Sequence, residues 1–483
     1  MTLLTKSKYL IGLQCPKYLW MMFHDLDKIP EFDLATEFII KQGNQIGQLA
    51  KQLFPGGVDL PEEDFKGNIQ KTAELIKAKK TIFEAGIVSG ELYARADVLV
   101  PAGDGWDIIE VKGSTKVKDE HIHDVSFQKY VYEKAGLKIR KCFLLHVNNE
   151  FVKKGKIKPK DLLIQEEITA EVNEAISGIQ ERIDDMMEIV NSEEAPDVSI
   201  GNGCNNGLEC VSEDCWSFLP EGHVFELYYG GKKSLELLEA EIFSIKDIPG
   251  DFKLSDKQEI QRKCANTGKE HINKQGIKKF LDNLEYPLYF LDFETLMSIA
   301  VPMFDGMKPY QQIPFQWSLH IDDGKEVKHF EYLASSKDDP RGKFLLELKK
   351  VLGSSGSIIV FSKSFEIGRL KELAEAFPSE KEWAESVISR IVDLIVPFRN
   401  FDYYNSKQKG SCSIKDVLPA VIGDNPYKKL DINAGGLASV SYYEMVYNDA
   451  ENKEKLREDL LKYCKLDTEA MVWIVDELKK ISK

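Results

Sequence analysis

The sequence predicts a two-domain α/β protein, and three observations support this. The chain has 483 residues, more than a single hydrophobic core usually supports. Residues 81–112 and 286–361 each contain short apolar runs bounded by turn residues, as strands do, and helical spacing flanks both stretches. The segment between them is helical and charged. We therefore expect an N-terminal domain over residues 1–225, a helical connector over 226–284 and a C-terminal domain over 285–483.

The composition is that of an ordinary soluble globular protein, with 43% hydrophobic and 30% charged residues. No apolar stretch approaches the ~20 residues that a membrane span needs, and the first residues lack the apolar core of a signal peptide. We therefore predict a cytoplasmic protein with no membrane association. The net charge of −15 argues against indiscriminate nucleic-acid binding, but it does not exclude a nuclease, because metal-site carboxylates add negative charge.

The first domain begins with helical spacing over residues 1–60, which ends at Pro55-Gly-Gly57. Alternating apolar patterns and Gly-containing turns then indicate a set of neighbouring strands followed by helices. The predicted elements are strands at 81–88, 91–101, 106–112 and 141–148, a helix at about 126–135 and a long helix at 165–192.

The second domain also mixes strands and helices over ~200 residues, an ordinary domain size. Its strands end at charged or turn residues, and its last helix is long. The predicted elements are strands at 287–294, 315–321, 329–333 and 357–361, and helices at 343–352, 365–377 and about 452–480.

Acidic residues converge in the predicted C-terminal domain. Asp292 and Glu294 are two residues apart in a strand, and Tyr463 and Asp467 are four apart in a helix, so each pair shares one face. Burying carboxylates in an apolar strand is costly unless positive charge lies among them. Mg²⁺ or Mn²⁺ prefers hard oxygen ligands and suits phosphodiester chemistry. The pattern therefore favours a metal-dependent nuclease.

A fourth carboxylate would complete a site for two metals. Glu366 begins the helix that follows the apolar run 357–361, so it is expected to face the end of that strand. Four carboxylates can hold two ions ~4 Å apart, one activating water and one stabilising the leaving oxygen. Tyr463, one helical turn before Asp467, is placed to orient the attacking water by a hydrogen bond.

These residues resemble the tyrosine-containing branch of the DEDD exonuclease superfamily, which has an RNase H-like fold. Asp292-x-Glu294 matches the first motif and Tyr463-x-x-x-Asp467 the third, and the resemblance covers residues 285–483. Glu366 stands where that superfamily usually has Asp, which lengthens the ligand by one methylene. The resemblance implies 3′→5′ exonuclease activity. The segment 410–419 also looks like part of an uncharacterised bacterial family with this arrangement.

A second acidic pattern lies in the predicted N-terminal domain. Glu110 and Lys112 alternate onto one face of a strand, beside Asp97 if the two strands form a hairpin. Two carboxylates can hold Mg²⁺, and the lysine can stabilise the nucleophile or the charge that develops on phosphate. Gln128 and Tyr132 share one face of the next predicted helix.

This pattern resembles the PD-(D/E)xK nucleases of the RecB and CRISPR-associated exonuclease type, over residues 1–220. Their motifs are Asp, Glu-x-Lys and Gln-x-x-x-Tyr in this order. These families usually also have a metal-binding His in a first-helix Gly-x-x-x-His, and here that position is Gly47. Either a water molecule, Gln45 or Gln48 takes the place of this metal ligand, or the centre binds metal more weakly.

The cysteines Cys204, Cys210 and Cys215 lie within a polar loop, and Cys15 is alone near the start of the chain. Nucleases of the RecB-like type frequently pair one N-terminal cysteine with three C-terminal ones around a [4Fe–4S] cluster, so the resemblance implies such a cluster on these four residues. Zinc is the alternative ligand. The other four are predicted to be core residues, with the Cys464 side chain pointing away from the Tyr463 motif.

Together these patterns predict a nuclease that acts on single-stranded DNA or DNA ends in DNA repair, recombination or defence. The resemblances imply a fusion of an iron–sulfur RecB-like domain with a DEDD-type exonuclease domain, an arrangement similar to that of the uncharacterised family. An RNA exonuclease is one alternative, because 2′-hydroxyl contacts cannot be recognised in sequence. A nucleic-acid end-binding regulatory protein with one or both centres inactive is the other.

Overall fold

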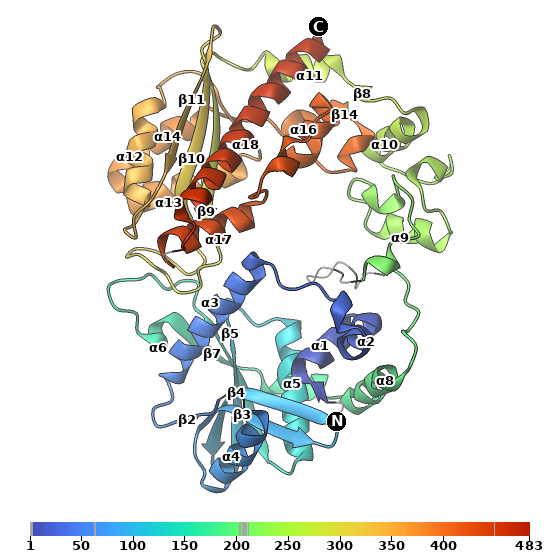
Figure 1. Cartoon of the computed structure of the whole chain (residues 1–483), viewed down its shortest axis with the longest axis vertical. Helices are drawn as coiled ribbons and strands as arrows, with labels where there is room; N and C mark the ends of the chain where they lie inside the picture. The colour runs from blue at the N-terminus through green and yellow to red at the C-terminus, as the bar shows by residue number, and fades with distance from the viewer. Residues whose placement is uncertain (1–2, 62–63, 202–203, 205–209, 211, 449) are drawn as a thin grey trace. The chain divides into compact units, whose positions relative to one another are not determined.

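A computed structural model describes residues 3–61, 64–201, 204, 210, 212–448 and 450–483 (Figure 1). The chain forms two compact units, and each is a mixed α/β structure, as the sequence predicts. Unit 1 comprises Met1–Ser217 and Ser298–Gln311, and unit 2 comprises Phe218–Met297 and Gln312–Lys483. The segment predicted as a connector, 226–284, therefore lies inside unit 2.

Unit 1 is built on a seven-stranded sheet in the order β2-β3-β4-β5-β6-β7, with β1 paired to β4. Its strands are β1 (Leu4–Thr5), β2 (Val58–Asp59), β3 (Ile82–Ser89), β4 (Leu92–Ala102), β5 (Gly105–Lys112), β6 (Ile139–Val147) and β7 (Leu163–Glu167). Its helices of four or more residues are α1 (Lys6–Gln14), α2 (Pro16–His24), α3 (Leu34–Lys51), α4 (Phe65–Lys77), α5 (Asp119–Lys134), α6 (Pro159–Leu162), α7 (Thr169–Ala175) and α8 (Ile179–Asn191).

The core of unit 1 joins its first helix to its sheet. The Tyr9 ring of α1 stacks on the Phe127 ring of α5 with centroids 4.9 Å apart, and both side chains are fully buried. Helix α5 lies against β3 and β4, which pair antiparallel, and Asp97 is a residue of β4. This packing brings the start of α1 beside β4 and β5, where the acidic residues of this unit lie.

Three sequence predictions for unit 1 were wrong in detail. The predicted helix 165–192 is β7 followed by two helices, which Gly178 separates in the left-handed conformation (φ +71°). Strand β7 pairs with β6, and this tertiary pairing overrides the helical pattern of its charged residues. Helix α5 begins at Asp119, about two turns before its predicted start near residue 126, and residues 1–60 include two short strands besides their helices.

Unit 2 contains a five-stranded sheet in the order β11-β10-β9-β12-β13 and a small sheet of β14 and β8. Its strands are β8 (His271–Ile272), β9 (Leu288–Leu296), β10 (Ile313–Asp322), β11 (Val327–Leu333), β12 (Ile358–Val360), β13 (Ile391–Asp393) and β14 (Tyr403–Tyr404). Its helices of five or more residues are α9 (Lys232–Glu239), α10 (Asp256–Thr267), α11 (Lys274–Leu281), α12 (Arg341–Val351), α13 (Ser364–Ala376), α14 (Lys381–Ser389), α16 (Ile414–Ile422), α17 (Gly435–Val446) and α18 (Lys453–Ser482), and the single turn α15 spans Val396–Arg399. The sequence did not predict the elements between α13 and α18.

The two faces of the larger sheet have different partners. Leu291 and Phe293 of β9 face the apolar core that α12, α13 and α14 cover. Asp292 and Glu294 alternate onto the opposite face, where α17 and α18 cross β9 (Figure 1). Strands β9, β12 and β13 are parallel, so their carboxyl ends lie along one edge, a usual place for a ligand site in α/β sheets.

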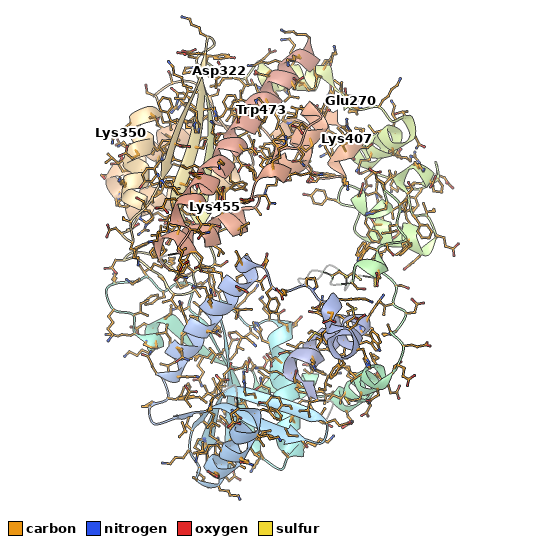
Figure 2. The ribbon with its side chains drawn as sticks, viewed as in Figure 1. Glu270, Asp322, Lys350, Lys407, Lys455 and Trp473 are labelled. Carbon is orange, nitrogen blue, oxygen red and sulfur yellow. The ribbon has the colours of Figure 1, made fainter. Side chains whose placement is uncertain are left out.

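Helix α18 is the longest of unit 2, at 30 residues, and it buries one stripe while charged residues such as Lys455, which pairs with Asp431 and Asp459, line its exposed side (Figure 2). Among the helices that the structure describes, none is long and apolar enough to cross a membrane. The buried stripe of α18 packs on β9 and β10, and this packing positions Asp467 over the sheet.

Candidate functional site

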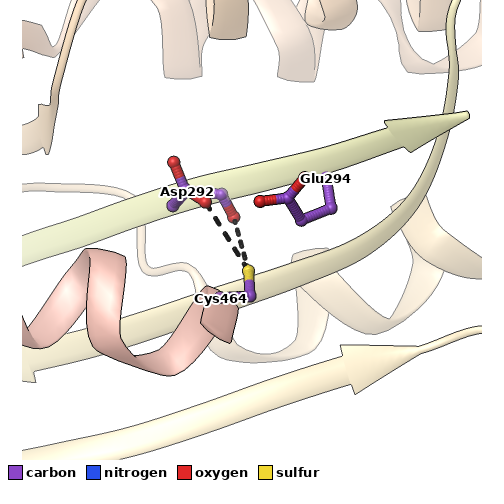
Figure 3. Close-up of side chains that lie close together, drawn as sticks. All are labelled: Asp292, Glu294 and Cys464. Carbon is purple, nitrogen blue, oxygen red and sulfur yellow. Dashed lines mark hydrogen bonds between the residues drawn. The ribbon is translucent and has the colours of Figure 1, made fainter. Parts of the chain in front are cut away.

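The C-terminal candidate centre is formed where β9 meets α18. Ligand atoms of Asp292, Glu294 and Cys464 lie within 4.8 Å of one another. Figure 3 shows the two carboxylates on the strand and the thiol approaching from the helix. Glu294 and Cys464 are buried and Asp292 is half-buried, so water has limited access to these groups.

Buried polar contacts hold α18 in its orientation. The Gln316 side chain on β10 donates to the Leu460 carbonyl at 2.8 Å. The Thr468 hydroxyl lies 2.7 Å from the Ser318 hydroxyl and 2.8 Å from His320 Nδ1. Gln316 and Ser318 are the register partners of Glu294 and Asp292. Because buried polar groups need partners, these contacts fix the helix above the acidic pair.

The electrostatics of this centre favour a bound cation. Burial, together with the charge of Asp467, raises the pKa of Asp292 and of Glu294 well above their usual values, and the charge of Glu294 adds to the rise for Asp292. Burial also raises the pKa of Asp467 to about 6. Like-charged carboxylates destabilise one another when they are ionised together, and a divalent cation removes that repulsion.

Glu366 in the first turn of α13 contributes a fourth carboxylate. The preceding turn is held by Asp393 at the end of β13, whose carboxylate accepts N–H groups of Ser362 at 2.9 Å and Lys363 at 3.1 Å. The Glu366 side chain is 1% exposed, and its Oε2 has no hydrogen-bond partner among the described residues. Burial raises its pKa to about 8.

An orphaned, buried carboxylate oxygen is costly unless it has a ligand. The charge of Glu366 adds to the raised pKa of both Asp292 and Glu294, so it lies within electrostatic range of the pair. The donor set of this centre, four carboxylates and one thiol, therefore fits divalent metal ions.

Tyr463 and Asp467 both lie on the buried side of α18. Within the described part of the chain, the Tyr463 hydroxyl has no hydrogen-bond partner, which leaves it available to a water or a substrate. The Asp467 carboxylate accepts a 2.6 Å hydrogen bond from the hydroxyl of Tyr427. Tyr427 was not predicted, because only the tertiary fold brings residues 40 positions apart together.

Lys415 was also missed by the sequence analysis. Its ammonium group lies 5.3 Å from the centre of the Tyr463 ring and 5.8 Å from that of Tyr427, and it donates to the Asn433 carbonyl. Its charge counteracts the rise in the pKa of Glu294 and Asp467. Its position in the segment 410–419, which the sequence analysis singled out, was the available signal.

The prediction for Cys464 was correct on burial and wrong on direction. Its thiol lies 3.6 Å from Asp292 Oδ2, as the dashed lines in Figure 3 show. Cys464 and Asp467 are three residues apart on the helix and so share a face. The thiol therefore places a soft donor atom beside the hard carboxylate oxygens. Of the other cysteines predicted to be core residues, Cys142 and Cys264 are buried and Cys412 is half-buried.

The N-terminal candidate centre lies on a cavity of about 500 Å³ in unit 1. Asp97, Glu110 and Lys112 all line it, as the alternation along β4 and β5 predicts. The Asp97 carboxylate accepts the backbone N–H of Val111 at 2.7 Å, which joins the two strands at the site. The Lys112 ammonium donates to Glu110 at 2.7 Å.

Two residues that the sequence analysis missed complete this cluster. Lys6, the first residue of α1, donates to Glu110 at 2.7 Å. Asp124 of α5 accepts from Lys112 at 2.6 Å. Gln128 donates to Glu110 at 2.7 Å and to Asp124 at 2.9 Å, so it holds the two carboxylates at a fixed spacing.

The lysines make this centre electrostatically unlike the C-terminal one. Burial alone would raise the pKa of Glu110, but Lys112 and Lys6 hold it well below its usual value. Burial and the neighbouring Glu110 raise the pKa of Asp97 to about 7. Two internal ammonium groups therefore already offset the negative charge that a metal ion would otherwise neutralise.

Neither Gln128 nor Tyr132 is among the residues that line this cavity, although the Gln-x-x-x-Tyr pattern predicts that both do. For Tyr132 the reason is its position between two strands. Its fully buried hydroxyl donates to the Ala85 carbonyl and accepts the N–H of Ala96 at 2.9 Å. It therefore bridges β3 and β4. Gly47 and Gln48 do line the cavity, whereas Gln45 does not, and a Cβ at Gly47 would meet no atom within 4 Å. The position of the absent histidine is open space.

The four predicted cluster cysteines line one cavity of about 230 Å³ in unit 1. Cys15 is the N-cap of α2, and its sulfur accepts the Tyr18 N–H at 3.4 Å. The Cys204 sulfur accepts the Gly201 N–H at 3.3 Å. Such N–H groups stabilise metal-bound thiolates. Of the loop predicted at 202–216, residues 202–203, 205–209 and 211 lie outside the described residues.

Comparison with known proteins gives relatives but no activity. A family model described as "Domain of unknown function (DUF2779)" matches residues 289–413, which include Asp292, Glu294 and Glu366. The chain is 24% identical to "Uncharacterized protein UU173" of Ureaplasma parvum over 67% of this chain and 53% of the relative. It is 29% identical to "Uncharacterized protein MG366" of Mycoplasma genitalium over 41% of this chain and 33% of that protein. The chain thus spans about half the length of the first relative and a third of the second.

We predict that the stability of the metal-free protein falls as pH rises. A carboxylate with a raised pKa binds its proton more tightly in the folded protein than in the unfolded one, so the bound proton stabilises the fold. This stabilisation is complete below the unfolded pKa of about 4. It is lost as pH rises through the folded pKa, which is about 6 for Asp467 and about 8 for Glu366. Melting temperatures in EDTA from about pH 5 to about pH 8.5 should fall by several degrees, and Mn²⁺ should stabilise most at high pH.

The control is the isosteric pair Asp292→Asn with Glu294→Gln, measured in the same buffers. Other carboxylates, such as Asp97, titrate in both proteins, so the difference between the two curves isolates the C-terminal centre. A shallower pH slope and a smaller Mn²⁺ shift are expected for the variant. Identical curves would show that these carboxylates neither repel one another nor bind the ion.

Proposed function

We propose that the protein is a metal-dependent nuclease whose working centre comprises Asp292, Glu294, Glu366 and Asp467. The observation that carries this proposal is the buried group formed by Asp292, Glu294 and Cys464, whose ligand atoms lie within 4.8 Å of one another. The charges of Glu366 and Asp467 act on both carboxylates of this group, and Glu366 Oε2 has no partner among the described residues. Their order along the chain and the strand or helix that carries each agree with the DEDD exonuclease pattern and an RNase H-like fold. No lysine or arginine forms an ion pair with the four carboxylates in the described part of the chain, unlike the centre of unit 1.

The residues around the four carboxylates have distinct parts in the proposed reaction. Bound Mg²⁺ or Mn²⁺ would supply Lewis acidity and neutralise charge on the scissile phosphate. The free hydroxyl of Tyr463 orients the attacking water, and Tyr427 holds Asp467 in one rotamer through its 2.6 Å hydrogen bond. Lys415 places a positive charge beside the site, where it can attract the substrate phosphate.

The centre of unit 1 has the residues of a PD-(D/E)xK nuclease but weaker grounds for binding a metal. Lys6 and Lys112 already pair with Glu110, and the position of the usual histidine is Gly47. These two observations favour a second role for this unit, in which it binds nucleic-acid ends and cleaves slowly or not at all. We propose that the substrate class of each centre is single-stranded DNA or DNA ends, with RNA as the alternative.

We propose further that Cys15, Cys204, Cys210 and Cys215 ligate a [4Fe–4S] cluster, with zinc as the alternative. All four thiols line one cavity, and N–H groups point at the sulfurs of Cys15 and Cys204. Cys15 precedes the other three by most of unit 1. The cluster would therefore close a long loop and stabilise the unit by several kcal/mol.

The nuclease proposal predicts that Asp292→Asn lowers cleavage of labelled single-stranded DNA by at least about a thousandfold, because it removes a ligand of the metal site. Lys112→Ala should reduce cleavage much less, and Tyr463→Phe should lower the rate by about ten- to a hundredfold while leaving Mn²⁺ binding intact. Product lengths on end-labelled strands report polarity.

The matched control is Asp416→Asn, a half-buried aspartate of α16 that the proposed site does not use. If Asp292→Asn retains cleavage and Lys112→Ala loses it completely, the active centre lies in unit 1. If the intact protein cleaves neither DNA nor RNA with any divalent metal, the nuclease proposal is wrong and the end-binding role is the remaining alternative.

The cluster proposal predicts that anaerobically purified protein is brown and contains about four iron atoms per chain. Cys204→Ser should lose most of this iron and lower the melting temperature, because three thiolates hold the cluster poorly. Cys412→Ser, a half-buried cysteine of unit 2, should retain full iron content. Colourless protein with stoichiometric zinc would replace the cluster with a structural zinc site.

A further inference from the structure

Unit 2 has a cavity of about 510 Å³ that the four carboxylates do not line. Two consecutive tyrosines, an arginine and the start of α16 form its walls. The residues that matter for its chemistry are Tyr228, Tyr229, Arg399, Ser362 and Ser413. Of these residues, only Ser413 lies in a segment, 410–419, that the sequence analysis singled out.

Tyr229 is presented to solvent at a conformational cost. Its side chain is 86% exposed, and its backbone has φ +49°, the left-handed region that favours glycine. Its ring packs edge-on against Tyr228 with centroids 4.5 Å apart, and Tyr228 in turn packs against the buried Phe401 at 5.0 Å. An exposed aromatic residue held in a strained conformation points to a function for its ring.

Two buried glutamines of α10 hold the backbone beneath these rings. Gln261 accepts the Tyr228 N–H at 2.6 Å and donates to the Glu226 carbonyl at 3.0 Å. Gln258 donates to the Tyr228 carbonyl at 3.0 Å. Both glutamines are 3% exposed or less. The tyrosine pair is therefore a rigid surface, which costs little entropy when a planar ligand stacks on it.

Positive charge surrounds the aromatic surface. The Arg399 side chain is exposed and has no hydrogen bond or ion pair with any residue that the structure describes. The Lys257 ammonium lies 5.2 Å from the centre of the Tyr228 ring. Lys407, labelled in Figure 2, is exposed on the turn that leads to the cavity at Gly410. Ser413 is the N-cap of the nine-residue helix α16, so its positive end opens onto the same space.

The chain connects this cavity directly to the carboxylate centre. Ser362 lines the cavity, and the turn it belongs to presents Glu366 two residues into α13. Ser413 and Ile414 line it at the start of α16, and Lys415 of the same turn lies beside Tyr463. A nucleic-acid strand whose end reached the carboxylates could therefore continue into this cavity.

We propose that this cavity binds a nucleotide of a single-stranded nucleic acid, with its base stacked on Tyr229 and its phosphate near Arg399 and the start of α16. This inference rests on the proposed nuclease function and names the substrate surface of that centre. Stacking tolerates every base, so the site contributes affinity without sequence preference.

The test measures binding of fluorescein-labelled dT12 to the full chain in EDTA, where no cleavage occurs. Tyr229→Gly should weaken binding about tenfold and leave the melting temperature unchanged or higher, because glycine is unstrained at this φ. Tyr229→Phe should bind within about twofold of the natural protein. Arg399→Gln should weaken binding and reduce its salt dependence. Tyr286→Ala removes a half-exposed tyrosine elsewhere in unit 2 and should change nothing.

Unchanged dT12 affinity in Tyr229→Gly would overturn the inference, as would equal weakening by Tyr286→Ala. A second measurement compares the affinity for free dTMP with that for dT12. Much weaker binding of dTMP supports a site for a nucleic-acid strand. Equal affinity would overturn the inference in favour of a mononucleotide site. Tyr229-dependent binding without any cleavage in Mn²⁺ would support this surface and refute the nuclease activity. Cleavage with Tyr229-independent binding would do the reverse.

Discussion

The main electrostatic constraint on unit 2 is the burial of like charges at the junction of β9 and α18. Asp292 and Glu294 face a helix that carries Asp467, and burial raises the pKa of all three. Such a cluster is unfavourable in an unliganded protein unless it is protonated or neutralised. The polar contacts of Gln316 and Thr468 nevertheless hold α18 over the strand. The fold thus maintains a site that a divalent cation would stabilise.

The two acidic centres show two solutions to the same electrostatic problem. In unit 1, Lys6 and Lys112 pair with Glu110, so the negative charge is offset within the protein. In unit 2, Lys415 lies near Glu294 and Asp467 without pairing with either, and the charge remains to be neutralised from outside. This difference, together with the open position at Gly47, is the basis of our proposal that unit 2 cleaves nucleic acid and unit 1 binds it.

Much of the candidate site could be predicted because it depends on local periodicity. The spacing of Asp292 and Glu294 in a strand, and of Tyr463 and Asp467 in a helix, places each pair on one face whatever the tertiary fold. Lys6, Asp124 and Tyr427 could not be predicted, since contacts between distant segments depend on how the elements pack. The single helix predicted at 165–192 failed for the same reason, because pairing with β6 makes β7 a strand. The α/β class is observed in both units, whereas the specific nuclease folds remain predictions.

The central claim is that the carboxylates of β9, α13 and α18 bind divalent metal. An anomalous difference map from crystals of the full chain grown with Mn²⁺ at about pH 8 tests it directly. The account predicts two peaks ~4 Å apart, with oxygens of Asp292, Glu294 and Asp467 at ~2.2 Å. A map with no peak at this centre, or with a lysine ammonium bound among these carboxylates in place of the metal, would contradict it.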